Sequence, residues 1–228
     1  MTQGDIPQIA NNHVITPEDV QKYNLGSLLI GGNFVPGKNN AYYDGWLDLA
    51  SFPNATAENW LTLGSNIFLP TEVKDEDGNT LYEVYPLLGT DAVHGNQHVI
   101  GTPLFPHNIG LAATHNPKCF QDAGYFMARD VLATGFNFAF APTVAVSHNF
   151  FWGRHYETMG AEPDWIHKYA AAFVKGAQAF DETSGSYKGV LTSTKHFLGD
   201  GATWWGVDEG NTTVHNFRTF LDRNYAGY

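Results

Sequence analysis

The order of apolar and amphipathic segments along this chain predicts an α/β fold, with a parallel sheet and helices packed outside it. Short apolar segments that are typical of strands alternate with segments that have helical periodicity. No repeat of fixed period and no linker-like composition interrupts the 228 residues, so we treat 1–228 as one domain or part of one.

Each of the four predicted strands is a short apolar segment, and the first of them ends in glycines. The segments lie within residues 24–32, 81–95, 136–142 and 189–197. Because helical segments separate them, the strands are expected to pair in parallel and not as hairpins.

The clearest predicted helix lies within residues 116–135. Asn116 is a good N-cap, Pro117 suits the first helical position, and Gly135 is placed to end the helix. Its apolar stripe is formed by Phe120, Ala123, Met127 and Val131. Further helices are predicted within 16–23, 56–70, 162–180 and 212–225.

Two closures of such a sheet are considered, a doubly wound open sheet and a (β/α)₈ barrel. No Gly-x-Gly-x-x-Gly motif follows the first strand, which disfavours a dinucleotide-binding fold. Polar side chains gather just after strand ends, where a barrel has its active site. Because about four strands are present and a barrel has eight, the prediction is a partial (β/α)₈ barrel with outer helices.

The charge balance excludes some partners. Twelve Lys and Arg against 23 Asp and Glu give a formal net charge of −11, which argues against nucleic acid and anionic membranes. No apolar run is long enough to predict a membrane span, and the first residues lack the pattern of a signal peptide. Cys119 is the single cysteine, so no intrachain disulfide is expected.

The polar residues after strand ends are the candidate site. Asp91 could accept hydrogen bonds or simply cap a turn. Arg154 could donate a fork of hydrogen bonds or lie on the surface against Trp152. Lys195 and His196 end the fourth strand, although neighbours on a strand point to opposite faces.

Other motifs carry less weight. His94 and His98 have the spacing of two metal ligands, but the Glu of His-Glu-x-x-His is absent, so no metal or cofactor is predicted. Gly199-Asp200-Gly201 indicates a turn. Trp204 and Trp205 would serve either as a platform for stacking a sugar or as buried core. Donors, an acceptor and tryptophans together suit a neutral polyhydroxyl ligand such as a sugar.

Four motifs resemble the N-terminal domain of glycoside hydrolase family 3. In chain order they are GTDAVHGNQHVIGTPLFPHNIGLAAT, ATGFNFAFAPTVAV, FFWGRHYET and KHFLGDGAT. The resemblance covers essentially the whole chain and is to the exo-β-glucosidases that act on glucans and cello-oligosaccharides. It implies a retaining hydrolysis of terminal non-reducing β-D-glucosyl residues. It also suggests a periplasmic or secreted enzyme.

The resemblance also implies roles for residues. Lys195 and His196 would bind hydroxyls of the terminal glucose, Asp91 would hold its far-side hydroxyls, and Arg154 and Glu209 would line the same site. The loop after His196 lacks the histidine of the family's β-N-acetylglucosaminidases, so their acid/base dyad is not expected. The opening MTQ is expected to be the tail of the family's first helix.

The family's nucleophile follows a seventh strand, and a second domain usually supplies its acid/base glutamate. Neither is expected within 1–228, so no catalytic residue is assigned here. The chain would supply the sugar-binding half of a β-glucosidase site and would be inactive alone. Its expected partners are the rest of the barrel and the second domain, or other copies of the chain that associate through exposed edges. The alternatives are a non-catalytic carbohydrate-binding or interaction fragment, and a metal-dependent barrel hydrolase suggested only by ten histidines.

Overall fold

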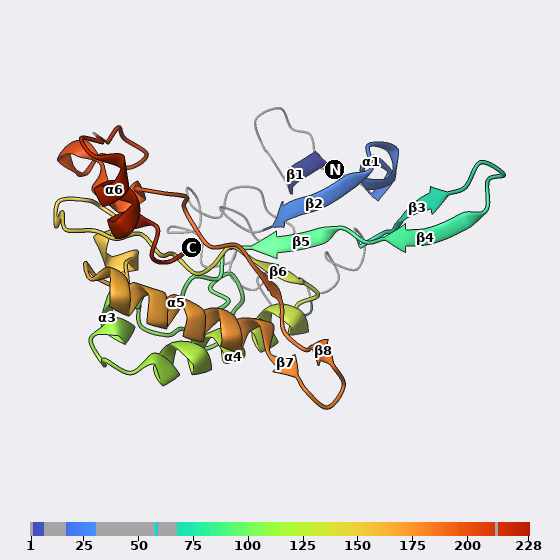
Figure 1. Cartoon of the computed structure of the whole chain (residues 1–228). Coiled ribbons are helices and arrows are strands. Elements are labelled where there is room, and N and C mark those ends of the chain that lie inside the picture. Colours follow the sequence, from blue (N-terminus) through green and yellow to red (C-terminus); the bar gives the residue numbers. More distant parts are fainter. Residues whose placement is uncertain (1, 7–16, 31–57, 59–67, 213) are drawn as a thin grey trace, which may run out of the picture. The chain divides into compact units, whose positions relative to one another are not determined.

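The computed structural model describes residues 2–6, 17–30, 58, 68–212 and 214–228 (Figure 1). The chain forms two compact units. The first unit comprises Met1–Asp91, Gln97–Thr102 and Val131–Phe138. The second unit comprises Ala92–Asn96, Pro103–Asp130 and Ala139–Tyr228.

The first unit is built on parallel strands. They are β1 (Thr2–Ile6), β2 (Leu25–Ile30) and β5 (Leu87–Thr90). Helix α1 (Pro17–Lys22) leads into β2, as the sequence predicts. Leu28 of β2 lies opposite Leu88 of β5, and both side chains are fully buried. Strand β1 pairs in parallel with β2, so the expectation that the chain opens on the tail of a helix is wrong.

Two short strands complete the main sheet, β6 (Phe138–Ala139) and β9 (Leu191–Thr192). Among the described residues the strand order is β1-β2-β5-β6-β9. Before β6, Asn137 exchanges hydrogen bonds with Leu88 through its backbone N–H and its side-chain oxygen, at 3.2 and 2.8 Å. Next to β9, the Ser193 N–H donates to the Ala139 carbonyl at 2.9 Å. The predicted α/β fold with a parallel sheet is confirmed.

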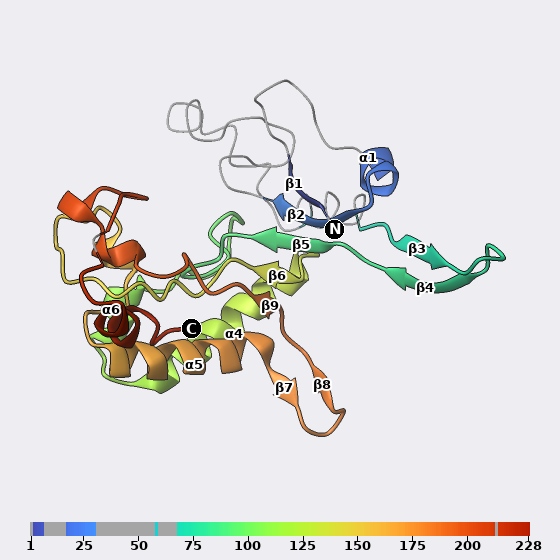
Figure 2. The same cartoon turned by 45° about the horizontal axis from the view of Figure 1, so that its top comes forward.

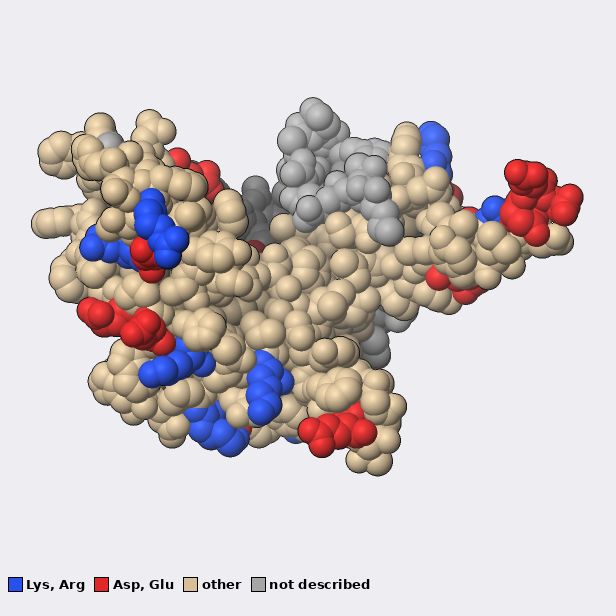
Figure 3. Space-filling view, viewed as in Figure 1, with Lys and Arg blue, Asp and Glu red and all other residues tan. Residues whose placement is uncertain are grey.

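Two hairpins lie outside the main sheet. Strands β3 (Thr71–Lys74) and β4 (Thr80–Val84) pair antiparallel, and so do β7 (Phe180–Asp181) and β8 (Ser186–Tyr187). The Asp75 carboxylate closes the first turn by accepting from the backbone N–H of Asp77 and Asn79. Acidic side chains gather at this tip (Figure 3). The segment predicted as one strand within 81–95 therefore contains the end of a hairpin as well as β5.

Four predicted helices are confirmed, namely α1 and the longer α4 (Pro117–Ala133), α5 (Pro163–Gln178) and α6 (Phe217–Asn224). The short helix α3 (Asn108–Ala112) is not among the predicted ones. Single 3₁₀ turns are η3 (His155–Glu157), η4 (Asp200–Ala202) and η5 (Trp204–Gly206). The helix predicted within 56–70 lies almost wholly outside the described residues. None of the described helices combines the length and apolarity that a membrane crossing requires.

Helices α4 and α5 lie side by side and form much of the second unit's core (Figures 1 and 2). Phe120 and Tyr169 stack with ring centroids 4.5 Å apart, and the buried Tyr169 hydroxyl donates to the Ala112 carbonyl. The helices approach closely at two glycines: a methyl group on Gly124 would collide with the Phe173 carbonyl, and one on Gly176 with the Gln121 carbonyl. All four side chains of the stripe predicted on α4 are buried.

Replacing Gly176 with Ala should destabilise the protein, because the new methyl group meets backbone that cannot move without separating the helices. Overpacking of this kind costs about 1–3 kcal/mol, which exceeds the gain of about 1 kcal/mol from replacing a helical glycine. The measurement is the free energy of unfolding in urea. Ala171→Ser, on the exposed side of the same helix, is the control and should change it little. Equal values for the two variants would contradict the close crossing.

Candidate functional site

The ends of strands β6 and β9 position the candidate site in the second unit. The Val144 N–H donates to the Lys195 carbonyl at 2.9 Å, and the Lys195 N–H donates to the Pro142 carbonyl at 3.0 Å. These bonds extend the parallel pairing past the strand ends, with Thr143 opposite Lys195. The backbone at Lys195 and His196, which are joined by a cis peptide bond, is therefore fixed to the segment that leads to Arg154.

Four side chains form a continuous hydrogen-bonded chain, which we call the polar cluster: Arg154, Glu157, His196 and Asp200. The Arg154 Nε and Nη2 donate to the two Glu157 carboxylate oxygens at 3.0 and 2.9 Å. The same Nη2 lies 2.9 Å from His196 Nε2, and His196 Nδ1 lies 3.0 Å from Asp200 Oδ2. Arg154 thus lies between a carboxylate and an imidazole.

The geometry determines the tautomer of His196. A guanidinium has only donors, so His196 Nε2 must accept the bond from Arg154. Nδ1 then carries the proton and donates it to Asp200. Asp200 is therefore the group that orients the imidazole, and its side chain is 8% exposed.

Burial and neighbouring charges shift the pKa of Arg154 in opposite directions. Partial burial opposes ionisation of Arg154, but the Glu157 carboxylate, with Asp208 and Asp200 further away, raises its pKa above the ordinary value. The polar cluster therefore keeps a fixed positive charge at Arg154. Burial, together with the nearby Asp200 carboxylate, raises the pKa of Tyr228 to about 12, so this phenol stays protonated at neutral pH.

Buried groups behind the polar cluster hold η3 in place. The amide of Asn108, 3% exposed, donates to the carbonyls of Glu157 and Thr143 at 2.8 and 3.3 Å. The rings of His94 and His107 stack 3.9 Å apart, and burial together with His94 lowers the pKa of His107. Within the part of the chain that the structure describes, no three His, Cys, Asp or Glu side chains gather as metal ligands would.

The predicted site residues are brought together in part. Arg154 and His196 are in contact, and Lys195 is fixed beside them. Asp91 belongs to the first unit and follows directly after β5, whereas Lys195 follows β9. Glu209 is exposed and has left-handed backbone; the residue of its loop that reaches Arg154 is Asp208, with Oδ2 3.9 Å from Nη1.

Sequence reasoning misses two members of the polar cluster. Glu157 stands three residues after Arg154, and Asp200 stands four after His196. These spacings typically bring charged side chains together on a helical turn. The sequence indicates only a turn at Asp200, and the turn is real, because Gly199 has left-handed backbone before η4.

The two tryptophans after the polar cluster are on the surface. Trp204 and Trp205 are 57% and 89% exposed, so the alternative that they are buried core is wrong. Their rings are therefore available to a ligand.

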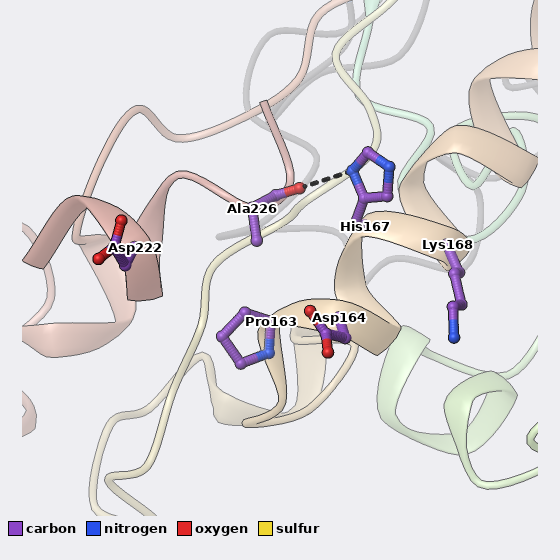
Figure 4. A pocket seen from close by; sticks show the side chains of 6 residues that line it. All are labelled: Pro163, Asp164, His167, Lys168, Asp222 and Ala226. Carbon is purple, nitrogen blue, oxygen red and sulfur yellow. Dashed lines mark hydrogen bonds between the residues drawn. The ribbon is translucent and has the colours of Figure 1, made fainter. Parts of the chain in front are cut away.

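A shallow hollow on the helices is a weaker candidate (Figure 4). It is lined by Pro163, Asp164, His167 and Lys168 of α5, by Asp222 of α6 and by Ala226, which lies beyond the end of α6. Within the hollow, His167 Nδ1 forms a hydrogen bond with the Ala226 carbonyl oxygen at 3.1 Å. No residue of the polar cluster lines the hollow, so the geometry at the strand ends is the better basis for chemistry.

Comparison with known families identifies the chain. The model of the glycosyl hydrolase family 3 N terminal domain matches residues 3–225. The chain belongs to this family. The resemblance found in the four motifs is thereby confirmed for nearly the full sequence.

Individual relatives of this family 3 chain are much longer. A lysosomal beta glucosidase of Dictyostelium discoideum is 29% identical over 212 residues, 87% of this chain but 23% of that protein. An exo-1,3/1,4-beta-glucanase from a Pseudoalteromonas species is 35% identical, with a TM-score of 0.80 over 99% of this chain and 25% of that chain. A beta-glucosidase from Listeria innocua, at 18% identity and a TM-score of 0.63 over 97% of this chain and 26% of that chain, shares the fold.

Glu157→Gln should destabilise the family 3 chain, because it leaves the partly buried Arg154 cation without its bidentate carboxylate. Losing one partner of such a pair costs about 1–3 kcal/mol, seen as a lower free energy of unfolding. Asp222→Asn is the matched control. It removes the carboxylate of an exposed pair with Arg218, and exposed pairs contribute little. A Glu157→Gln protein as stable as the control would mean that Arg154 does not need this partner.

Proposed function

We propose that residues 1–228 supply the sugar-binding half of the active site of a retaining β-glucosidase, which removes terminal non-reducing β-D-glucosyl residues from glucosides or β-glucans. The observation that carries the proposal is the polar cluster at the ends of adjoining strands, in a chain 35% identical to an exo-1,3/1,4-beta-glucanase. A monosaccharide needs donors and acceptors in fixed positions. In the proposal Arg154 and Lys195 supply donors, while Asp91 and Glu209, which lie outside the polar cluster, supply acceptors.

Each side chain of the proposed site would have its own role in binding the sugar. The Arg154 guanidinium and the Lys195 ammonium would donate to sugar hydroxyls, since neither group can accept. His196 has both ring nitrogens engaged, so its role would be to orient Arg154 and present its ring edge to the sugar. Asp91 and Glu209 would accept hydrogen bonds from hydroxyls. Charge-assisted bonds of this kind are stronger than neutral ones, which favours a ligand rich in hydroxyls.

The carboxylates of the second unit's cluster do not suit the covalent step. A retaining glycosidase uses two carboxyls about 5–5.5 Å apart, one as nucleophile and one as acid and base. Glu157 is held by Arg154, and Asp200 is held by His196. Both carboxylates are thereby used to position Arg154 and His196, and we do not propose either as nucleophile or acid/base. As the family resemblance implies, we assign these two roles to protein outside residues 1–228.

One observation favours the alternative, a carbohydrate-binding fragment without catalysis. The carboxylates of the polar cluster are all engaged in holding Arg154 and His196. Product formation by the full-length protein distinguishes the two functions.

In the full-length protein, Lys195→Ala and Asp91→Asn should each lower kcat/KM for a β-glucoside about 10- to 100-fold, because each removes a charge-assisted hydrogen bond to the sugar. Steady-state kinetics with cellobiose measures this. Lys188→Ala removes an exposed lysine of the second unit that pairs loosely with Asp181, and it should leave kcat/KM unchanged. If Lys188→Ala lowered kcat/KM as much as Lys195→Ala, the loss would come from the change in net charge and not from a hydrogen bond at the site.

Residues 1–228 expressed alone should not hydrolyse an aryl β-glucoside with an activated leaving group above the rate in buffer. Such a substrate reduces the need for a general acid, so the assay tests for the nucleophile. Release of the aryl alcohol that disappears in Glu209→Gln would overturn the assignment of the catalytic carboxylates to protein outside this segment.

A further inference from the structure

One buried amide joins the two segments of the second unit that carry Arg154 and Lys195. Asn108 is 3% exposed, and its side-chain nitrogen lies 2.8 Å from the Glu157 carbonyl oxygen and 3.3 Å from the Thr143 carbonyl oxygen. We propose that Asn108 is a positioning residue, which fixes Arg154 relative to Lys195 for sugar binding without contacting the sugar itself. The inference rests on the proposed function and adds to it a residue outside the polar cluster.

The chemistry of the two partners explains why an asparagine suits this position. Both partners are backbone carbonyl oxygens, which only accept hydrogen bonds, so the NH₂ group of the Asn108 amide and not its oxygen must face them. An NH₂ group has two protons, and one nitrogen can therefore bond both carbonyls at once. An ionised carboxylate offers no proton, and a hydroxyl offers one. Asn108 is thus matched to two acceptors that come from different segments of the chain.

The first of these bonds fixes the turn that holds Arg154. The Glu157 carbonyl belongs to η3, and the carboxylate of the same residue accepts from Nε and Nη2 of Arg154. The Glu157 N–H also donates to the Arg154 carbonyl at 2.9 Å. Because main chain and carboxylate belong to one residue, holding the Glu157 backbone determines where its side chain directs the guanidinium.

The second bond fixes the segment that pairs with Lys195. Thr143 is fully buried and lies opposite Lys195 in the parallel pairing. On either side of Thr143, the Val144 N–H donates to the Lys195 carbonyl, and the Pro142 carbonyl accepts from the Lys195 N–H. The two residues that would donate to sugar hydroxyls are therefore both tied, through their backbone or their partner, to one amide.

The segment that carries Asn108 is itself held from the other side. The Phe105 N–H donates to the His94 carbonyl at 2.8 Å, and His94 Nδ1 donates to the Phe105 carbonyl at 2.9 Å. The ring of His107, the residue before Asn108, stacks on His94 and meets the Tyr156 ring of η3 edge-on at 4.6 Å. The amide therefore projects from a fixed backbone, as a positioning role requires.

The first test needs no ligand and measures amide hydrogen exchange in the full-length protein. Asn108→Ala should speed exchange about three- to tenfold at the N–H groups of Glu157, Thr158 and Lys195, since their segments lose a common hold. Exchange in α4 should stay unchanged, which distinguishes local release from a general loss of stability.

The matched control is Asn224→Ala, which removes another buried asparagine of the second unit. Asn224 is 4% exposed, and its side chain donates to the Phe220 carbonyl within α6 at 2.9 Å. This variant should speed exchange in α6 and leave η3 as it is. Wild-type exchange at η3 in Asn108→Ala would overturn the proposed positioning.

The second test is isothermal titration of the full-length variants with glucose. Asn108→Ala should raise the Kd about three- to tenfold, and Asn224→Ala should leave it unchanged. Asn108→Asp keeps the size of the side chain but has no proton to donate when ionised. It should also weaken binding at neutral pH, and its ratio to the wild-type Kd should fall at acidic pH, where the protonated carboxyl donates one bond again.

The outcomes separate this inference from the proposed function. Wild-type protein that does not bind glucose, or binds it no better than Lys195→Ala, overturns the proposed function, and the role of Asn108 in sugar binding with it. If Lys195→Ala weakens binding but both Asn108 variants keep the wild-type Kd, the inference about Asn108 alone is wrong. Fewer binding sites per protein at an unchanged Kd would show a role in folding only and would also overturn it. If Asn108→Ala yields no folded protein, Asn108→Ser, which keeps one donor, is measured in both tests instead.

Discussion

The candidate site depends on providing hydrogen-bond partners for one partly buried cation, the Arg154 guanidinium. Two of its nitrogens are held by Glu157, one of them also contacts His196, and Asp208 lies near a third. A guanidinium removed from water is stable only if its donors are engaged. The consequence is that η3, the segment after β9 and the loop around Asp208 converge on one point, although they are far apart in the sequence.

This constraint explains why some of the surrounding residues orient Arg154 and His196 while others are left for a ligand in our proposal. Asp200 and Glu157 are used to orient His196 and Arg154, so they are unsuited to attack a substrate. In our proposal a ligand would meet the donors of Arg154 and Lys195, together with the exposed carboxylates and rings of the loop after His196. A surface of this composition would suit hydroxyls and C–H faces, and in our account the bond-breaking carboxyls come from elsewhere in the protein.

Part of this organisation can be predicted from the sequence, and the reason differs between elements. Helix α4 is predictable to within a few residues because Asn116, Pro117 and Gly135 are strong local signals. Strand β1 is not, because TQGDI has no apolar pattern and its pairing with β2 is a tertiary property. Strands β6 and β9 are only two residues long, so an apolar segment predicts their presence but not their length.

The site shows the same division. The position of Arg154, Lys195 and His196 after strand ends marks them as candidates for binding, and the contact between Arg154 and His196 follows from the fold. The sequence cannot show that Asp200 turns its carboxylate to His196, since Gly-Asp-Gly is equally a simple turn. Nor can it show that Trp204 and Trp205 face solvent, because that depends on the contact of Gly206 with Phe151.

The most direct test of the central claim is a crystal structure of the full-length protein with β-glucose bound. Our account predicts sugar hydroxyls within hydrogen-bonding distance of Arg154 and Lys195, with the contact between Arg154 and His196 preserved. Glucose bound elsewhere, for example in the hollow lined by α5 and α6, with the polar cluster facing only solvent or protein, would contradict it.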